Sequence, residues 1–231
     1  MKVMILAAGR GERLRPLTDH TPKPLLHAGP KRLIEYLIDK LVAAGFDNIV
    51  INHAHLGEQF EPILGSGERY HAHFEYSAEV AGGLETAGGI IQALPLLGNE
   101  PFLVVNGDIW TDFPFDELAK MDLAKEQLCH LVMVNNPAHN PAGDFYLDSD
   151  GLLSLDGEPK LTFSGIAIYR PEMFAEHPVT KLALKPFFVE AMKQRKASGQ
   201  HYQGQWSDIG TVERLTALAK QLGISGAKKL Q

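Results

Sequence analysis

A glycine-rich segment followed by basic residues lies near the amino terminus. It reads Leu6-Ala7-Ala8-Gly9-Arg10-Gly11-Glu12-Arg13, and Lys23 follows it in Pro22-Lys23-Pro24-Leu25. Small residues let backbone N–H groups approach an anion closely, and fixed cations suit the spread charge of a triphosphate. A dinucleotide fingerprint requires glycine where Leu14 stands, and a P-loop requires Gly-Lys-Ser/Thr, so both of these phosphate loops are excluded. The segment predicts a loop of another kind that binds a triphosphate.

Two carboxylates lie in motifs that follow predicted strands. Asp108 stands in Asn106-Gly107-Asp108, and Asp208 stands in Trp206-Ser207-Asp208-Ile209-Gly210-Thr211. Mg²⁺ takes oxygen ligands and usually few protein carboxylates, with phosphate oxygens completing its shell. A carboxylate at the end of a strand, as at Asp108, is therefore well placed to hold Mg²⁺. Each motif also has an ordinary structural interpretation, a turn for Asn-Gly-Asp and a helix N-cap for Asp208.

The elements that must position these residues alternate in type over the first half of the chain. We expect strands over residues 2–6, 48–52, 73–76 and 102–106, and helices over 33–44, 56–64 and 86–97. Strands separated by helices predict βαβ crossovers, a mostly parallel sheet and the α/β class. Residues 7–32 have no hydrophobic period and far exceed a usual βα connection of about 2–6 residues. This long loop is predicted to bind a ligand at the carboxyl edge of the sheet.

The second half has shorter elements. We expect strands over residues 128–134, 145–147, 152–155, 161–169 and 201–206, helices over 187–196 and 212–222, and a tail after Gly223. Because no linker or repeat separates the halves, we expect one domain over residues 1–231. Its two halves, over residues 1–112 and 113–231, are expected to share one sheet.

The composition excludes several classes of protein. The chain has 22 basic and 28 acidic residues, a net charge of −6, which opposes binding to nucleic acid or to a membrane surface. The amino terminus has no signal-peptide layout, and no apolar run is long enough for a membrane span, so a cytoplasmic protein is expected. Cys129, the single cysteine, predicts a reduced thiol in the core. The basic residues concentrate in the first 32 positions, namely Lys2, Arg10, Arg13, Arg15, Lys23, Lys31 and Arg32.

The string from Leu6 to Leu25 resembles the signature of the nucleotidyltransferases that join a nucleoside triphosphate to a sugar 1-phosphate. That signature is Leu-Ala-(Ala/Gly)-Gly-x-Gly-x-Arg-(Leu/Met)-x-Pro-Leu-Thr followed by Pro-Lys-Pro-Leu. The resemblance implies a Rossmann-like, mixed sheet flanked by helices, of the GT-A-like kind. It also implies that Gly11 and Arg13 hold the β- and γ-phosphates and that Lys23 contacts the α-phosphate. Asp108 and Asp208 would together bind the catalytic Mg²⁺.

Other segments extend this resemblance over essentially the whole chain. The resemblance implies a nucleotide-binding half over residues 1–112 and a sugar-binding half over residues 113–231. In Leu84-Glu85-Thr86-Ala87-Gly88-Gly89, many relatives have glycine where Glu85 stands, so the role of Glu85 stays open. Thr86 is a candidate helix cap, and Gly88 is implied to contact the nucleotide. The remaining site residues implied by the resemblance are Ala8, Gly9 and Glu12 for the nucleotide and Asn106, Gly143, Glu158 and Gly165 for the sugar.

The Glu-Thr-(Ala/Gly)-Gly-Gly loop and the short chain resemble a compact bacterial branch of the family. Its members are uridylyltransferases that act on N-acetylmuramic acid 1-phosphate, a step of peptidoglycan recycling. The resemblance implies UTP and this sugar phosphate as partners, and a direct in-line displacement. A lactyl-bearing sugar would call for a donor or cation near Gly143. The alternatives are a mannose or heptose phosphate guanylyltransferase, a phosphocholine cytidylyltransferase and a non-catalytic nucleotide-binding regulatory module. No oligomeric state is predicted.

Overall fold

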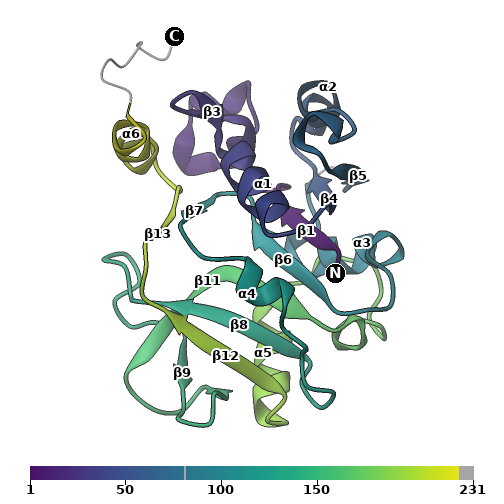
Figure 1. Cartoon of the computed structure of the whole chain (residues 1–231), viewed down its shortest axis with the longest axis vertical. Helices are drawn as coiled ribbons and strands as arrows, with labels where there is room; N and C mark the ends of the chain where they lie inside the picture. The colour runs from purple at the N-terminus through teal and green to yellow at the C-terminus, as the bar shows by residue number, and fades with distance from the viewer. Residues whose placement is uncertain (81, 224–231) are drawn as a thin grey trace.

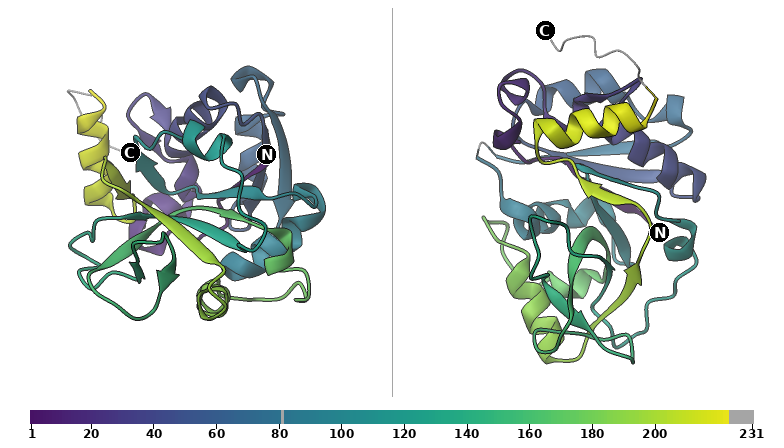
Figure 2. Two further views of the ribbon diagram at one scale, coloured as in Figure 1. Left: turned by 60° about the horizontal axis from the view of Figure 1, so that its bottom comes forward. Right: turned by 90° about the vertical axis from the view of Figure 1, so that its left-hand side faces the viewer.

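A mixed β-sheet of nine strands runs through the centre of the molecule, and helices cover both of its faces (Figures 1 and 2). The structure is a computed structural model, and it describes residues 1–80 and 82–223. The tail predicted after Gly223 lies outside these residues. The strands of the main sheet are β1 (Val3–Leu6), β4 (Asn48–His53), β5 (His73–Ala78), β6 (Phe102–Asn106), β8 (Cys129–Val134), β9 (Phe145–Leu147), β10 (Leu153–Ser154), β11 (Lys160–Tyr169) and β12 (Ala197–Tyr202).

The amino-terminal part of the sheet is parallel. Its strands lie in the order β5-β4-β1-β6, as βαβ crossovers require. Leu6 at the end of β1 is in register with Asn52 on one side and with Asn106 on the other. The carboxyl ends of three strands therefore meet at one edge. This is the edge at which the long loop after β1 begins.

The carboxyl-terminal part continues the same sheet with antiparallel pairs. The long strand β11 pairs antiparallel with β6, β8 and β9, while β12 runs parallel to β8. The predicted mixed sheet is confirmed. The strand predicted over residues 201–206 was wrong, because the chain joins the sheet earlier, at Ala197 opposite Cys129. Pairing with the fully buried β8 outweighs the weak strand propensity of this segment, Ala-Ser-Gly-Gln-His-Tyr.

The two faces of the sheet carry separate hydrophobic cores, because alternate side chains of a strand point to opposite sides. The helices are α1 (Leu33–Ala43), α2 (Phe60–Leu64), α3 (Glu85–Leu97), α4 (Asp116–Ala119), α5 (Lys185–Lys193) and α6 (Val212–Gln221). Val3 and Ile5 of β1 pack with α1 and α4, whereas Met4 packs with α3 and α5. The helix predicted over residues 187–196 corresponds to α5, which begins and ends earlier than predicted. Pro186 lies in the first turn of this helix.

The segment between β1 and α1 is ordered by apolar anchors. It contains three short 3₁₀ turns and the hairpin of β2 (His27–Ala28) and β3 (Lys31–Arg32). Leu14 and Leu26 of this segment pack against Leu215 and Leu218 of α6, which crosses the molecule beside it (Figure 2). The carboxyl-terminal helix therefore supports the predicted phosphate loop. The burial of these leucines explains why a long segment without regular secondary structure keeps one conformation.

A short ribbon connects the two halves close to the sheet edge. It pairs β7 (Ile109–Thr111) with β13 (Trp206–Asp208) in antiparallel fashion, with Asp208 opposite Ile109. The backbone N–H of Ile209 also donates to the carbonyl of Asp108, at 2.8 Å. The two predicted metal-binding segments are thereby brought side by side.

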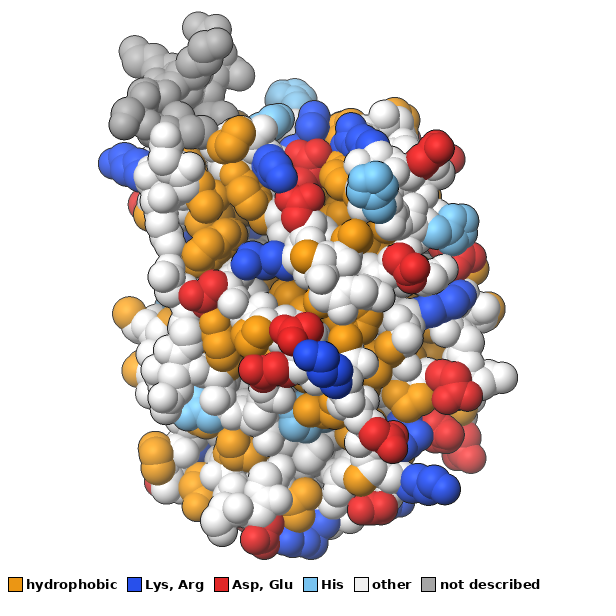
Figure 3. All heavy atoms as spheres, viewed as in Figure 1, with side chains coloured by type: hydrophobic (Ala, Val, Ile, Leu, Met, Phe, Trp, Pro, Cys, Tyr) orange, Lys and Arg blue, Asp and Glu red, His pale blue; other side chains and the backbone are white. Residues whose placement is uncertain are grey.

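On the face seen in Figure 3, Lys and Arg side chains lie between Asp and Glu side chains. Neither sign of charge forms a continuous patch on this face.

Within residues 1–80 and 82–223, no helix has the length and apolar character that crossing a membrane demands.

Candidate active site

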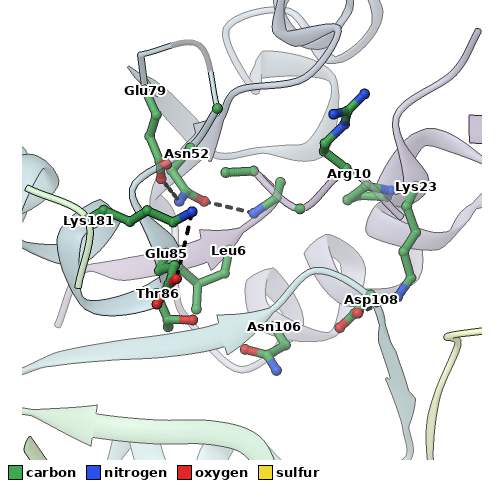
Figure 4. A pocket seen from close by; sticks show the side chains of 16 residues that line it. Leu6, Arg10, Lys23, Asn52, Glu79, Glu85, Thr86, Asn106, Asp108 and Lys181 are labelled. Atoms are coloured by element: carbon green, nitrogen blue, oxygen red, sulfur yellow. Dashed lines mark hydrogen bonds and ion pairs between the residues drawn. The ribbon is translucent and has the colours of Figure 1, made fainter. Parts of the chain in front are cut away.

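A cavity of about 330 Å³ opens at the carboxyl edge of the parallel strands (Figure 4). Its volume lies at the lower end of the range usual for small-molecule sites. Its walls come from the end of β1 and the loop after it, from the ends of β4 and β6, from the segment between β5 and α3, from the start of α3 and from one lysine before α5. They are Leu6, Ala7, Ala8, Gly9, Arg10, Lys23, Pro24, Asn52, Glu79, Gly82, Gly83, Glu85, Thr86, Asn106, Asp108 and Lys181.

Lys23 and Asp108 form an ion pair at one end of this cavity, and Figure 4 shows their side chains pointing toward one another. Lys23 is only 7% exposed, a rare degree of burial for a lysine, which needs such a partner. Leu25 in the same 3₁₀ turn is buried and anchors the lysine. On the other side, the Gly107 N–H donates to the Leu6 carbonyl at 2.8 Å, which fixes the turn that presents Asp108. The ammonium of Lys23 is thus held ready to bind an anion, and the carboxylate of Asp108 is held ready to bind a cation.

A buried amide fixes the backbone at the opposite end of the cavity. The Oδ1 atom of Asn52 accepts the Ala7 N–H at 2.7 Å, and its Nδ2 atom donates to Glu79 at 2.6 Å. The second carboxylate oxygen of Glu79 accepts the Leu84 N–H, also at 2.7 Å. Asn52 is 2% exposed. This network ties the predicted phosphate loop to the start of α3, so both walls hold one relative position.

Asp208 lies beside the site on β13 but outside the lining of the cavity. Its Oδ1 atom pairs with Arg214 of α6 and lies 3.1 Å from His139 Nε2. A methyl group built on Gly210 would lie 2.9 Å from the Arg13 guanidinium and 3.2 Å from Asp208 Oδ2, so Arg13 approaches the same segment. Thr211, not Asp208, caps α6, because its side chain accepts the Arg214 N–H at 3.3 Å. Asp208 is thus held in place by its ion pair with Arg214.

The oxygen ligands near the cavity suit a hard cation whose coordination shell is completed by further oxygen atoms from outside the protein. The structure places the backbones of Asp108 and Asp208 in neighbouring segments and gives each carboxylate one oxygen engaged by a basic side chain. Among the residues it describes, no group of three or more His, Cys, Asp and Glu side chains is arranged to hold a metal. A site of two carboxylates with phosphate oxygens is the arrangement that fits Mg²⁺ and not Zn²⁺.

A second cavity, of about 420 Å³, adjoins the first. The two share Leu6, Glu85, Thr86 and Asn106. The rest of its wall comes from β6, β11 and the start of α5, and consists of Val104, Phe163, Gly165, Tyr169, Ala183, Leu184, Lys185 and Phe188. Burial raises the pKa of Tyr169 well above its ordinary value, so this phenol is neutral at physiological pH. The aromatic and aliphatic residues make one side of the second cavity apolar, whereas Glu85, Thr86 and Asn106 make its border with the first cavity polar.

The structure brings part of the predicted site together. Ala8, Gly9, Lys23, Asn106 and Asp108 line the first cavity, and Asn106 and Gly165 line the second. Asn106 and Gly165 touch, since a side chain on Gly165, at φ +82°, would overlap the Asn106 amide.

The other predicted site residues lie outside both linings. Gly11, at φ +65°, packs against Thr18 and Lys23, and Glu12 and Arg13 are exposed. Gly88 faces the carbonyl of Thr180, which a methyl group there would overlap. The remaining two lie on loops of the second half: Gly143 packs against Asn136 and Lys160, and Glu158 is exposed. Thr86 is not the cap of α3, which begins at Glu85.

Sequence reasoning missed Asn52, Glu79, Lys181 and Lys185, although all four line a cavity. Asn52 carried a signal, because an amide at the end of an otherwise apolar strand marks the sheet edge where ligands bind. The two lysines carried none. Lys181 belongs to an irregular segment, and Lys185 begins α5 directly after it. This segment is held against α3 by tertiary hydrogen bonds, from Ala87 N–H to the Leu182 carbonyl at 3.0 Å and from Leu182 N–H to the Leu84 carbonyl at 2.9 Å.

Comparison with known proteins gives consistent results. The chain is 54% identical to the N-acetylmuramate alpha-1-phosphate uridylyltransferase of Neisseria meningitidis serogroup B over 93% of its own length and 95% of that protein. It is 31% identical to the protein of the same name from Caulobacter vibrioides, with 95% and 96% covered. Its fold is similar to that of UDP-glucose pyrophosphorylase complexed with UDP-glucose, with a TM-score of 0.73, 21% identity, and 96% and 97% of the chains covered. A family model described as nucleotidyl transferase matches residues 2–223, and the chain belongs to this family.

Proposed function

We propose that the protein transfers the uridylyl group of UTP to N-acetylmuramic acid α-1-phosphate and so forms UDP-N-acetylmuramic acid and pyrophosphate. The observation that carries the proposal is the ion pair of the buried Lys23 with Asp108 in a cavity at the sheet edge. It occurs in a chain 54% identical to a protein named for this reaction. The proposal gives the two adjoining cavities separate tasks, the first holding the nucleotide and the second the sugar.

The reaction is a direct displacement at the α-phosphorus. An oxygen of the sugar phosphate attacks, the bond to the bridging oxygen breaks, and pyrophosphate leaves with the electron pair. The attacking oxygen is already anionic, so no general base is needed, and catalysis consists of positioning and charge stabilisation. Lys23 donates to the α-phosphate, on which charge builds up in the transition state. Arg13 is exposed beside Gly210, and it neutralises the charge of the departing pyrophosphate.

The backbone of the loop after β1 provides the remaining anion contacts. Ala8 and Gly9 line the cavity, and no side chain there blocks close approach of phosphate oxygens to their N–H groups. Asn52 holds the preceding residue, Ala7, in position. The loop thus binds the triphosphate without rearranging, which limits the entropy lost on binding.

Mg²⁺ fits the donor set, and we assign Asp108 and Asp208 to hold it. The ion would supply charge neutralisation to the phosphate groups. Lys23 donates to one carboxylate oxygen of Asp108, and its ammonium has further hydrogens with which it would reach a bound phosphate. The carboxylate of Asp208 is oriented by Arg214.

A uridylyltransferase of this specificity salvages a cell-wall sugar, so we place the protein in peptidoglycan recycling. We propose the cytoplasm as the compartment of the reaction.

Pyrophosphate release from a matrix of substrates tests the proposal. Each common nucleoside triphosphate is crossed with N-acetylmuramic acid, N-acetylglucosamine, glucose, mannose and heptose 1-phosphates and with phosphocholine. We expect the highest kcat/KM for UTP with N-acetylmuramic acid 1-phosphate, and no release when Mg²⁺ is replaced by EDTA. Preference for GTP with mannose or heptose phosphate, or for CTP with phosphocholine, contradicts the proposed substrates. Absence of release with every pair contradicts catalysis altogether.

A further inference from the structure

We propose that Lys185 binds the lactyl carboxylate of the acceptor and thereby selects N-acetylmuramic acid 1-phosphate over N-acetylglucosamine 1-phosphate. The inference rests on the proposed function and names the residue that determines its sugar specificity. The two sugars differ at one position, where the first carries a lactyl ether and the second a hydroxyl. A carboxylate on an otherwise similar ligand is best recognised by a fixed cation.

The second cavity is the space available to the acceptor sugar. It shares Leu6, Glu85, Thr86 and Asn106 with the first cavity, in which Asn106 and Asp108 stand close together at the end of β6 (Figure 4). A sugar whose phosphate lies beside Lys23 and Asp108 therefore extends its ring into the second cavity. The aromatic rings of Phe163, Tyr169 and Phe188 offer an apolar wall there, suited to the methyl groups of an acetamido and a lactyl substituent.

Lys185, an exposed residue at the edge of this cavity, is the source of positive charge in its lining. Among the described residues that line it, Lys185 is the one cation and Glu85 the one carboxylate. Glu85 already has a counter-ion, because Lys181 Nζ lies 3.9 Å from its Oε1 atom and Figure 4 shows the two side chains pointing toward one another. Within residues 1–80 and 82–223, no carboxylate oxygen lies within 4.0 Å of Lys185 Nζ. The ammonium is thus available to a ligand.

The position of Lys185 in its helix also supports a role in binding a carboxylate. It is the first residue of α5, and the first turn of that helix contains no acidic residue. A cation is unfavourable at a helix amino terminus, where the unpaired N–H groups already carry partial positive charge. Conflicts of this kind between a residue and its local structure concentrate at functional sites. At the cavity wall, the lysine and the helix terminus together give a positive potential that attracts a carboxylate.

Glu85 sets the boundary of the carboxylate site. It adopts the left-handed conformation at φ +57°, which glycine would adopt without strain, and it lines both cavities. Because Lys181 already pairs with Glu85, the border between nucleotide and sugar has no net positive charge to offer a second carboxylate. The lactyl group is therefore directed away from this border and toward α5.

The cation expected near Gly143 is replaced by Lys185 in this arrangement. The space beside Gly143 is filled by Asn136 and by the backbone of Lys160. Lys160 is the competing candidate, since its side chain belongs to the strand that passes Gly143. Lys181 is a second competitor, held at Glu85. Both enter the test as separate variants.

The test measures kcat/KM with saturating UTP for both acceptors, together with their inhibition constants where turnover is slow. Lys185→Gln should lose roughly 10- to 100-fold with N-acetylmuramic acid 1-phosphate, as expected for one charge-assisted hydrogen bond. It should change little with N-acetylglucosamine 1-phosphate, and Lys185→Arg should retain the preference. Lys193→Gln, in the last turn of the same helix, is the matched control. Added salt should narrow the preference of the wild type.

Equal losses with both acceptors, no loss at all, or a selective loss in Lys160→Gln or Lys181→Gln instead would overturn the assignment to Lys185. These results leave the proposed function intact, because the wild type still uses the lactyl-bearing acceptor. A wild type that uses neither acceptor with UTP rejects the proposed function itself, and the inference with it.

Discussion

Removing the side chain of Asn52 should weaken both the fold and nucleotide binding. The Asn52→Ala variant leaves the Ala7 N–H without its acceptor and one oxygen of Glu79 without its donor, at a position that is 2% exposed. A neutral hydrogen bond contributes about 1 kcal/mol and one to a charged group about 1.5–3 kcal/mol. The expected loss of stability is therefore about 2–4 kcal/mol. For a chain of this length, that corresponds to a fall in Tm of roughly 4–16 °C.

The kinetic effect follows from the loop that Asn52 anchors. Ala8 and Gly9 come directly after the residue that Asn52 holds, and both line the nucleotide cavity. Displacement of a positioning element by about 1 Å costs on the order of 100-fold, so kcat/KM for UTP should fall by roughly 10- to 100-fold. The loss should lie mainly in the KM for UTP, because the network does not contact Lys23 or Asp108.

Differential scanning calorimetry and steady-state kinetics measure the two effects, with Asn48→Ala as the control. Asn48 begins the same strand but is exposed.

Exchanging the side-chain amide of Asn52 with the carboxylate of Glu79 is a sharper test. In the Asn52→Asp/Glu79→Gln double variant, the new carboxylate accepts from the Ala7 N–H and from the new side-chain amide, whose own oxygen accepts from the Leu84 N–H. The double variant should be more stable than either single variant. The reasoning is refuted if Asn52→Ala matches Asn48→Ala in both measurements, or if the double variant is the least stable of the three.

The remaining predictions concern other parts of the molecule. Lys23→Ala should lower kcat by about two to four orders of magnitude at saturating UTP, as expected for loss of a group that stabilises transition-state charge; near-native kcat in stopped-flow assays would reject that role. Gly88→Ala should displace the segment around Thr180, whose carbonyl faces Gly88, and limited proteolysis should cleave that segment faster, whereas unchanged proteolysis with weakened UTP binding would favour a direct nucleotide contact. Native Cys129 should resist a thiol reagent at pH 8 and react after unfolding in guanidinium, because burial raises the pKa of its thiol to about 12; rapid labelling of the native protein would contradict its burial.

The cysteine also implies a direction for alkaline stability. The folded thiol keeps its proton up to a pKa of about 12, whereas the thiol of an unfolded chain loses it near its ordinary pKa. Above that ordinary value the native state binds more protons, so the contribution of Cys129 to stability falls as pH rises toward 12.

Much of the fold was predictable because its causes are local in the sequence. The apolar runs at β1, β4 and β6, each separated by a helical pattern, predicted parallel strands, and the shared sheet edge followed from them. The family followed from one ordered string between Leu6 and Leu25, and the comparisons confirm it. The predicted roles of Arg13, Asp208 and the sugar-binding residues stay predictions.

What the sequence did not indicate depends on tertiary contacts. Strand β12 begins at Ala197 because β8 offers it a partner there, and the weak strand propensity of its residues gave no signal. Lys181 and Lys185 reach the cavities only because Leu182 exchanges backbone hydrogen bonds with the first turn of α3. Gly88 illustrates the opposite case, in which a residue chosen for its motif is in contact with the Thr180 carbonyl. Packing between distant segments decides all of these positions.

A competition in one vessel tests the central claim most directly. The wild-type protein receives equal, limiting amounts of ATP, CTP, GTP and UTP with an equal mixture of the sugar 1-phosphates, and early products are identified by mass spectrometry. Product ratios under competition report ratios of kcat/KM. The proposed function predicts UDP-N-acetylmuramic acid as the dominant product in the presence of Mg²⁺. Dominance of any other nucleotide sugar, or no nucleotide sugar at all, would contradict it.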